Sequence, residues 1–290
     1  MDFSLNTLFQ PYNSQIEFKT FLILLENITS LSKEIILSQK TIKLNDKKLQ
    51  LLKSYINRLK KKEPIEYILN QAYFRDNNYF VTNSVLIPRI ETERLIDIAF
   101  KILNNKFHSK KLIYILEIGT GSGCISIELA LLLLTKRRSN FKILATDISG
   151  KAINIAKKNR NNLLNQNQQI KNLINFKKAN IIPQRTSIKF DLIISNPPYI
   201  PAREINTLPD SVKNYEPHIA LNGGIDGLKI FKEIIQETTK NKTDETTYIF
   251  EIHSPKANQL ESLLQNLHAQ NIQFFDDQFN RKRFVSFTLP

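Results

Sequence analysis

Residues 112–134 read LIYILEIGTGSGCISIELALLLL: an apolar run, a glycine-rich segment and a second, longer apolar run. The first run, Leu112–Ile118, is short and rich in isoleucine, which predicts a buried strand, whereas Gly123–Leu134 is long enough for a helix. A strand, a glycine-rich loop and a helix in this order form the opening unit of a doubly wound sheet. In such sheets, ligands bind at the carboxyl ends of the strands.

The same alternation continues to the end of the chain. Further helices are expected at Ser149–Leu164, Gly227–Thr239 and Pro255–His268, and further strands at Phe141–Thr146, Ile174–Lys177, Phe190–Ser195, Tyr248–Ile252, Ile272–Phe275 and Phe284–Thr288. No helix separates the last two strands, so one member of the sheet is expected to be antiparallel. This pattern predicts an α/β fold with a doubly wound, mostly parallel, seven-stranded sheet.

The first 70 residues have a different, helical pattern. Apolar residues recur at helical spacing in two groups: Phe18, Phe21, Leu22 and Leu25, then Leu49, Leu52, Ile56 and Leu59. Asn45 is the predicted cap of the second helix, with Leu44 and Leu49 forming a hydrophobic staple. A hairpin follows, with strands Ala72–Phe74 and Tyr79–Thr82 and a turn at residues 76–78, and then a helix over residues 91–104. We therefore expect a small helical domain over residues 1–70, a hairpin linker over 71–90 and a ligand-binding α/β domain over 91–290.

Composition restricts the class of protein. The chain has 290 residues, a net charge of +14, one cysteine and four histidines. These numbers exclude an internal disulfide and show no metal-ligand cluster, so we expect no metal. No apolar run approaches the roughly 20 residues that span a bilayer, and the acidic N-terminus does not resemble a targeting peptide. We expect a cytoplasmic monomer without membrane association. The charge indicates either an acidic partner such as a nucleic acid or merely a lysine-rich composition.

Three of only seven glycines lie in the segment Glu117-Ile-Gly-Thr-Gly-Ser-Gly123. This spacing is neither the dinucleotide fingerprint nor a P-loop. Glu117 would repel a pyrophosphate but attract a cation, and Asp147, after the second strand, suits a ribose diol because a carboxylate accepts two hydroxyl hydrogens. S-adenosylmethionine, which carries an amine and a sulfonium, fits this set better than NAD; the alternative is a tight turn without a ligand. Cys124 is expected to pack as a small hydrophobe rather than to act as a nucleophile.

Asn196-Pro-Pro-Tyr199 follows the fourth strand of the sheet. An amide or aromatic amine nitrogen is a poor nucleophile because its lone pair is delocalised. Two acceptors aimed at its N–H bonds would orient that lone pair and stabilise the developing positive charge. The side-chain oxygen of Asn196 and the carbonyl of Pro197 can supply them, and Tyr199 can stack on a flat substrate group. The alternative is an ordinary Asn-Pro turn at a strand end.

Asn-Pro-Pro-Tyr after such a strand resembles the methyltransferases that act on amino groups of adenine or guanine or on glutamine amides. Three more segments resemble the release-factor glutamine methyltransferases (the PrmC/HemK family): Glu63-Pro-Ile-Glu-Tyr-Ile68, Leu86-Ile-Pro-Arg-Ile-Glu-Thr-Glu93 and Tyr215-Glu-Pro with Ala220-Leu-Asn-Gly-Gly-Ile-Asp-Gly-Leu228. The likeness covers nearly the whole chain and is strongest over residues 63–228.

The resemblance implies a class I methyltransferase of Rossmann-like fold that forms N5-methylglutamine in the Gly-Gly-Gln loop of class I peptide chain release factors. It implies that the helical domain docks the release factor. It also implies two sets of site residues. The cofactor would contact Glu117, Gly119, Thr120, Gly121, Ser122, Gly123, Asp147, Asn180, Ile181 and Asn196, and the glutamine would contact Asn196, Pro197, Pro198 and Tyr199. Arg89 and Glu91 would shape the entrance, or form a surface pair at a helix start.

The chain departs from the family pattern at several positions. Asn180 replaces a usual acid that would accept the adenine amino group, and Ile181 would pack on the adenine where an aromatic residue is common. His253 replaces a glycine and is expected at the surface, and Asn222 replaces another acid. Two alternatives stay open: an N-methyltransferase of adenine or guanine in DNA or RNA, and a binding protein that has lost its chemistry. No stable nucleic-acid complex is expected, because the N-terminal segment lacks an obvious recognition helix.

Overall fold

The computed structural model describes residues 1–164 and 172–290, and these residues form two compact units. Unit 1 consists of Met1–Gln71 and Pro209–Tyr215, and unit 2 of Ala72–Leu208 and Glu216–Pro290. The chain therefore crosses between the units three times, after residues 71, 208 and 215. The segment 71–90, expected to be a linker, is part of unit 2 from Ala72 onward.

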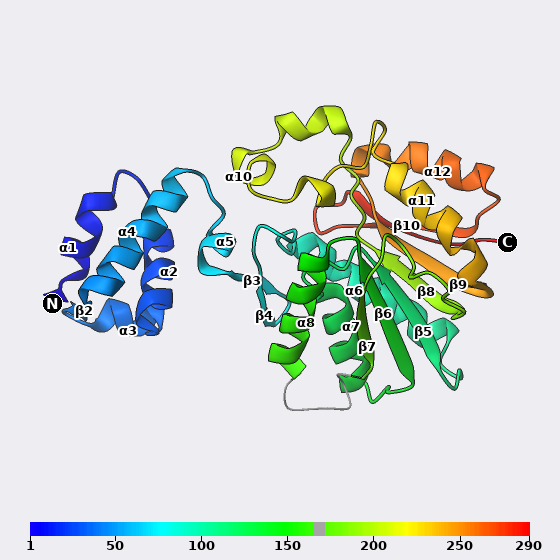
Figure 1. Ribbon diagram of the computed structural model, residues 1–290, viewed down its shortest axis with the longest axis horizontal. Coiled ribbons are helices and arrows are strands. Elements are labelled where there is room, and N and C mark those ends of the chain that lie inside the picture. The colour runs from blue at the N-terminus through cyan, green and yellow to red at the C-terminus, as the bar shows by residue number, and fades with distance from the viewer. Residues whose placement is uncertain (165–171) are drawn as a thin grey trace. The chain divides into compact units, whose positions relative to one another are not determined.

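Unit 1 is a small helical unit, and Figure 1 draws its residues 1–71 in blue to cyan and its residues 209–215 in yellow-green. Asn45 begins its longest helix as predicted, since its side chain accepts a hydrogen bond of 2.9 Å from the amide of Lys48. The buried side chains include Phe21, Leu25 and Ile56. Its elements are β1 (Asp2–Phe3), α1 (Leu5–Phe9), η1 (Gln10–Tyr12), α2 (Phe18–Thr29), α3 (Lys33–Ser38), β2 (Ile42–Lys43), α4 (Asp46–Lys60), α5 (Ile65–Leu69) and α10 (Asp210–Lys213).

The segment Pro209–Tyr215 joins unit 1 although it is remote in sequence, and the sequence pattern did not predict this. Its helix α10 is held by Asp210, whose carboxylate lies 2.5 Å from the Lys62 ammonium. The Tyr215 hydroxyl donates a hydrogen bond of 2.7 Å to the carbonyl of Lys61. Both partners follow the end of α4, so this short segment packs against one end of that helix.

Unit 2 contains the predicted seven-stranded sheet, with strand order β10-β11-β9-β8-β5-β6-β7. Only β11 is antiparallel to its neighbours, which confirms the expected single antiparallel member. The strands are β5 (Ile113–Ile118), β6 (Phe141–Asp147), β7 (Ile174–Lys178), β8 (Phe190–Ser195), β9 (Lys242–Glu251), β10 (Gln270–Asp276) and β11 (Lys282–Thr288). The bounds of the four neighbouring parallel strands β5, β6, β7 and β8 match the predicted ranges to within one residue.

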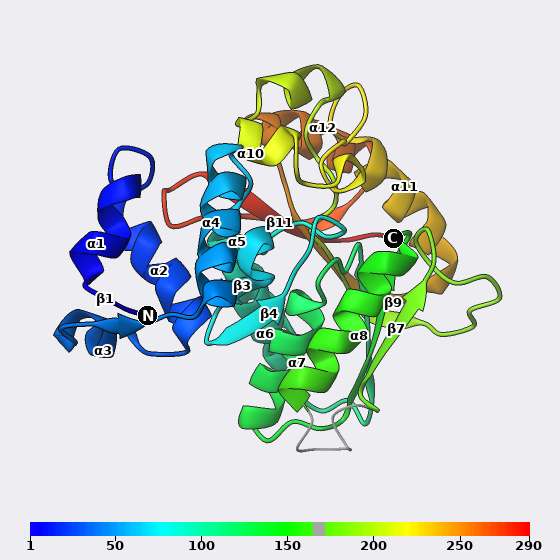
Figure 2. The same cartoon turned by 60° about the vertical axis from the view of Figure 1, so that its left-hand side comes forward.

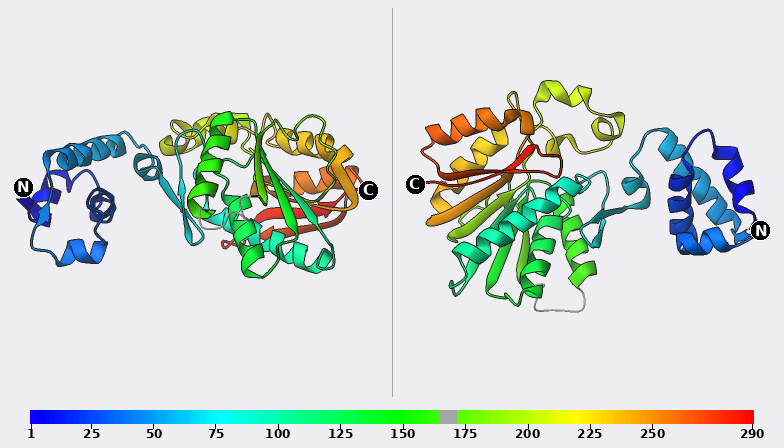
Figure 3. Two further views of the ribbon diagram at one scale, coloured as in Figure 1. Left: turned by 60° about the horizontal axis from the view of Figure 1, so that its bottom comes forward. Right: turned by 180° about the vertical axis from the view of Figure 1, so that it is seen from behind.

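Helices cover both faces of this sheet. Figures 1 and 3 show α6, α7 and α8 against one face and α11 and α12 against the other. The second face buries a large apolar core that includes Phe231, Tyr248 and Phe287. The helical elements of unit 2 are η2 (Ile90–Thr92), α6 (Glu93–Lys106), α7 (Cys124–Thr135), α8 (Gly150–Leu164), η3 (Ala202–Thr207), η4 (His218–Ala220), α11 (Lys229–Thr238), η5 (Thr239–Asn241), η6 (Ser254–Lys256) and α12 (Ala257–Asn266).

The hairpin of β3 (Gln71–Phe74) and β4 (Asn77–Phe80) lies beside α8 (Figure 2). The Tyr79 hydroxyl and the Asn77 amide both donate to Glu128 of α7, at 2.6 and 2.8 Å. These bonds explain why the hairpin belongs to unit 2 rather than to a linker. Its turn lies at residues 75–76, not 76–78 as predicted, because Arg75 adopts the left-handed conformation (φ 51°) and reverses the chain earlier.

Candidate active site

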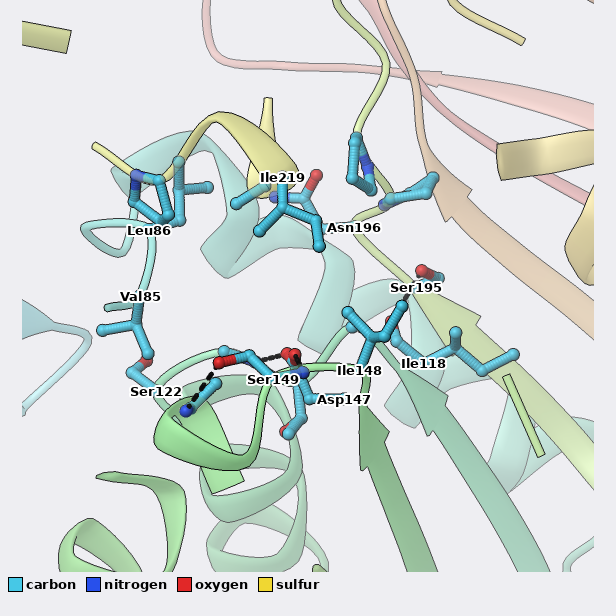
Figure 4. Close-up of a pocket in the computed structure, with 18 of the residues that line it drawn as sticks. Val85, Leu86, Ile118, Ser122, Asp147, Ile148, Ser149, Ser195, Asn196 and Ile219 are labelled. Carbon is cyan, nitrogen blue, oxygen red and sulfur yellow. Dashed lines mark hydrogen bonds between the residues drawn. The ribbon is translucent and has the colours of Figure 1, made fainter. Parts of the chain in front are cut away.

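A cavity of about 170 Å³ lies at the carboxyl ends of the parallel strands of unit 2. Figure 4 shows Asn196 and Ile219 on one side of this cavity and Asp147 and Ser149 on the other. The predicted site residues that line it are Arg89, Gly119, Thr120, Gly121, Ser122, Asp147, Asn180, Ile181, Asn196, Pro197 and Pro198. The structure therefore brings together residues from five separate parts of the sequence.

The glycine-rich loop is shaped by residues with positive φ. Gly123 has φ 83°, and a β-carbon on it would lie 3.0 Å from the Ala156 side chain and 3.1 Å from that of Phe176. Gly123 does not line the cavity, so a glycine is required at this position by the close packing beneath the loop rather than by contact with a ligand. The amide of Thr120 donates to the carbonyl of Thr146 at 2.9 Å, which ties the loop to the end of β6.

Asp147 holds the same loop from the end of β6. Its two carboxylate oxygens accept the amides of Gly121 and Ser149, at 2.9 and 2.8 Å. Burial raises the pKa of this carboxyl, while the two amide hydrogen bonds act in the opposite direction. A carboxylate oxygen can accept more than one hydrogen bond, so Asp147 can still receive a ligand hydroxyl in the cavity that it lines.

Glu117 is fully buried at the end of β5 and does not line the cavity. Its Oε2 atom accepts hydrogen bonds from Thr120 and Ser126, whereas Oε1 has no partner among the described residues. Burial raises the pKa of this carboxyl to about 7 despite these hydrogen bonds. A buried oxygen without a partner indicates a place where water or a ligand group completes the site.

Asn180 and Ile181 follow β7 and complete the side of the cavity near Asp147. Asn180 is exposed, so its amide is accessible, whereas Ile181 is buried and only part of its side chain reaches the cavity wall. The hydroxyl of Thr146 donates to the Ile181 carbonyl at 2.7 Å, which fixes this segment to β6. The pair thus offers one polar and one apolar surface beside the loop.

The Asn196–Tyr199 segment is clamped by the second glycine cluster of the chain, which consists of Gly223, Gly224 and Gly227. The amide of Ile200 donates to the Leu221 carbonyl at 3.0 Å, and the amide of Gly223 donates back to the Ile200 carbonyl at 2.8 Å. On the other side, the backbone oxygen of Asn196 lies close to Gly119, 3.9 Å from where a β-carbon would be. The loop after β8 and the glycine-rich loop after β5 therefore meet at the cavity.

A row of hydrogen bonds runs behind Asn196. Its Nδ2 atom donates to the Thr92 hydroxyl at 3.2 Å, and that hydroxyl donates to Oε2 of Glu251 at 2.6 Å. Thr92 and Glu251 are both buried. The sequence pattern predicted no role for either residue, although Thr92 lies in the segment Leu86–Glu93 and Glu251 in the predicted strand Tyr248–Ile252.

Tyr199 occupies a different place from the one predicted by its substrate-stacking role. It does not line the cavity, and its hydroxyl donates to Oε1 of Glu251 at 3.1 Å. Its ring stacks on His253, with ring centroids 6.0 Å apart and an interplanar angle of 10°. His253 is half-buried beneath this ring, so the expected surface position for it is wrong. The pKa of Tyr199 is raised mainly by burial, because the phenolate would lose its solvation. The nearby negative charge of Glu251 raises it further.

The two residues expected at the entrance of the site, Arg89 and Glu91, differ in their position relative to the cavity. Arg89 lines the cavity and its guanidinium lies 2.5 Å from the buried carboxylate of Glu216. Glu91 does not line the cavity. Cys124 does contribute to the wall, but burial raises the pKa of its thiol to about 12, so a nucleophilic thiolate is disfavoured at neutral pH.

Similarity to known proteins identifies the family to which the chain belongs. Residues 89–211 match the family model of the methyltransferase small domain. A release factor glutamine methyltransferase of Flavobacterium psychrophilum is 33% identical over 91% of this chain and 89% of its own length. One of Lactococcus lactis is 33% identical over 90% of each chain. The solved N-terminal domain of human METTL16, in complex with SAH, shares 15% identity with a TM-score of 0.48 over 96% of each chain. The chain belongs to the release factor glutamine methyltransferase family.

Proposed function

We propose that this protein methylates the side-chain amide nitrogen (N5) of a glutamine, in the Gly-Gly-Gln loop of class I peptide chain release factors. This proposal rests on the hydrogen bonding of the Asn196 side-chain amide. Its Nδ2 atom is bonded to Thr92, and Oδ1 has no hydrogen bond to any other described residue. Asn196 lines the cavity, so Oδ1 is available there as an acceptor for a substrate N–H.

The substrate amide needs two acceptors, because its lone pair must be turned out of conjugation and its growing positive charge must be stabilised. The carbonyl of Pro197 is the second one, held by a Pro-Pro backbone that has no amide hydrogens to compete for it. Pro197 is buried, which keeps this acceptor rigid. Tyr199 supports the segment through Glu251 and His253 rather than by forming the cavity wall.

S-adenosylmethionine, when bound, supplies an electrophilic methyl group on a sulfonium centre. The residues of this chain that would hold it are Asp147 for the ribose hydroxyls, Asn180 and Ile181 for the adenine, and the Gly119–Gly123 loop. Glu117 is fully buried and does not line the cavity, so it would favour the cationic amine of the cofactor through its charge rather than by direct contact. Asn180 would accept the adenine amino group through its amide oxygen, in place of an acid.

The relatives are named for a release factor substrate, and the same partner follows here. Among the helices of the described residues, none combines the length and the apolar character needed to cross a bilayer. We assign the protein to the cytoplasm, where release factors act, and propose that it works as a monomer. Unit 1, with its own apolar core, is the proposed docking domain for the release factor.

A methyl-transfer assay tests the proposal. The protein is incubated with isotopically labelled S-adenosylmethionine and an unmodified release factor, and the label is located by mass spectrometry. The same factor with its loop glutamine changed to alanine is the matched control, and duplex DNA and ribosomal RNA are rival substrates. Label confined to the loop glutamine is the expected result. Label on nucleic acid would overturn the proposal and would indicate that the net charge of +14 serves to bind a nucleic-acid substrate.

A further inference from the structure

Thr92 and Glu251 come from distant parts of the chain, 159 residues apart, yet they meet behind Asn196. Glu251 is the last residue of β9, and its parallel neighbour β8 ends at Ser195, directly before Asn196. Thr92 is the residue that precedes α6. The sheet register and the start of a helix thus place a carboxylate, a hydroxyl and an amide in one row.

The number of hydrogens available in this row determines which group donates and which accepts in each hydrogen bond. A threonine hydroxyl has one hydrogen, and Thr92 donates it to Glu251 over 2.6 Å. Toward Asn196, at 3.2 Å, Thr92 can then offer only a lone pair. The end of the Asn196 amide that faces Thr92 must therefore be the NH₂ group, and the oxygen is the end left for the cavity.

We propose that Glu251 and Thr92 are positioning residues that hold the Asn196 amide with its oxygen toward the cavity; this rests on the proposed glutamine methylation. The reversed amide would present two N–H donors to a substrate that itself offers N–H donors. Tyr199 occupies the second oxygen of Glu251, at 3.1 Å, which keeps the carboxylate oriented toward Thr92. No atom of Glu251 lines the cavity, so its effect is indirect.

Three variants separate orientation from simple packing. Thr92→Val keeps the shape but removes the hydroxyl, and Glu251→Gln can donate to Thr92 and so release the hydroxyl hydrogen toward Asn196. Thr92→Ser keeps the hydroxyl and is the matched control. We expect kcat on the release factor to fall about 10- to 100-fold in the first two variants. KM, the affinity for S-adenosylhomocysteine measured by calorimetry, and the Thr92→Ser kcat should stay within about threefold of wild type.

A readout independent of activity uses ¹⁵N-asparagine labelling and NMR. The side-chain NH₂ signal of Asn196 is assigned by its loss in Asn196→Ala. It should shift in Thr92→Val and in Glu251→Gln but not in Thr92→Ser. Wild-type kcat and unshifted signals in Thr92→Val would overturn the inference, as would equal losses in Thr92→Val and Thr92→Ser. Failure of the wild-type enzyme to label the glutamine would instead overturn the proposed function, and the NMR signals would still decide the orientation.

Discussion

A β-carbon on Gly223 would lie 2.7 Å from the Cα atom of Tyr199 and 2.8 Å from the carbonyl oxygen of Pro198. The second glycine cluster is thus pressed directly against the backbone that follows Asn196. Any side chain at residue 223 would clash with that backbone and displace it. This displacement costs free energy, because a main chain, unlike the end of a flexible side chain, cannot move aside without disturbing the packing around it.

Gly223→Ala should therefore lower kcat by up to about 100-fold, since a displacement near 1 Å of a substrate-orienting group has an effect of this size. The free energy of unfolding should fall by about 1–3 kcal/mol. Gly150→Ala is the matched control, because its β-carbon would meet only the Lys178 side chain at 3.6 Å, an ordinary contact. Kinetics and urea unfolding would measure both. Full activity in Gly223→Ala would show that the loop does not depend on this packing.

Asn196→Ala removes one of the two proposed acceptors without touching the glycine-rich loop. We expect turnover to fall about 100-fold or more, by analogy with the loss of one oriented oxyanion-hole partner. Affinity for S-adenosylmethionine should remain within a few-fold of wild type. Asn175→Ala, an exposed asparagine in β7, is the control. Turnover near the wild-type value in Asn196→Ala would reject its role as acceptor.

Glu117 makes the stability of the ligand-free protein depend on pH. Burial raises its pKa from the ordinary 4.5 to about 7, so between these values the folded protein keeps a proton that the unfolded chain has lost. The free energy of unfolding should therefore fall as pH rises through this range, by about 3 kcal/mol at most. Glu117→Gln cannot titrate, so its stability relative to wild type should rise by a similar amount between pH 4.5 and pH 8.

Urea unfolding at a series of pH values measures this difference. Glu237→Gln, at an exposed position, is the control because it changes the net charge by the same amount. Parallel pH curves for wild type and Glu117→Gln would contradict the assignment of a raised pKa to Glu117.

Asn159 is a buried asparagine of α8 that supports the glycine-rich loop from below. Its Nδ2 atom donates to the carbonyls of Ser122 and Phe80, at 2.9 and 3.0 Å, and its oxygen accepts the Phe80 amide at 2.7 Å. Asn159→Ala leaves these groups without partners and should cost on the order of 3 kcal/mol of unfolding free energy. Affinity for S-adenosylmethionine should also weaken, because Ser122 lines the cavity.

The exposed Asn162→Ala on the same helix should change stability by less than about 0.5 kcal/mol. Calorimetric titration and thermal unfolding of the two variants test this pair. A loss of stability with unchanged cofactor affinity in Asn159→Ala would show that the loop keeps its shape without this support.

The parallel strands could be predicted closely, and most simply β5 and β8, whose residues are nearly all buried and which appear as mainly apolar runs. The exception was β9, which begins at Lys242 rather than Tyr248. Its first residues are polar, and hydroxyl bonds such as that of Thr246 to the Phe190 carbonyl satisfy them. No apolar pattern marks such a segment, so its length depends on the neighbouring strand.

Asp147 and Asn196 could be recognised as cavity residues from their positions and motifs, but the roles of Thr92, which also lines the cavity, and of Glu251, which does not, could not. Asn196 and Asp147 stand at strand ends where chemistry is expected. Thr92 and Glu251 act through each other, and a pairing between residues so far apart leaves no trace in local spacing. His253 was misplaced for the same reason, since its stacking on Tyr199 depends on two adjacent strand ends.

The three crossings of the chain between the units have a practical consequence for dissecting the protein. Cleavage after residue 71 alone would leave Pro209–Tyr215 attached to unit 2 while Lys61 and Lys62, its partners, left with the other fragment. A fragment that starts at Ala72 would expose this orphaned segment shortly after the Asn196–Tyr199 loop. Because unit 1 is built from two separate stretches of the chain, truncation at residue 71 cannot isolate either unit intact.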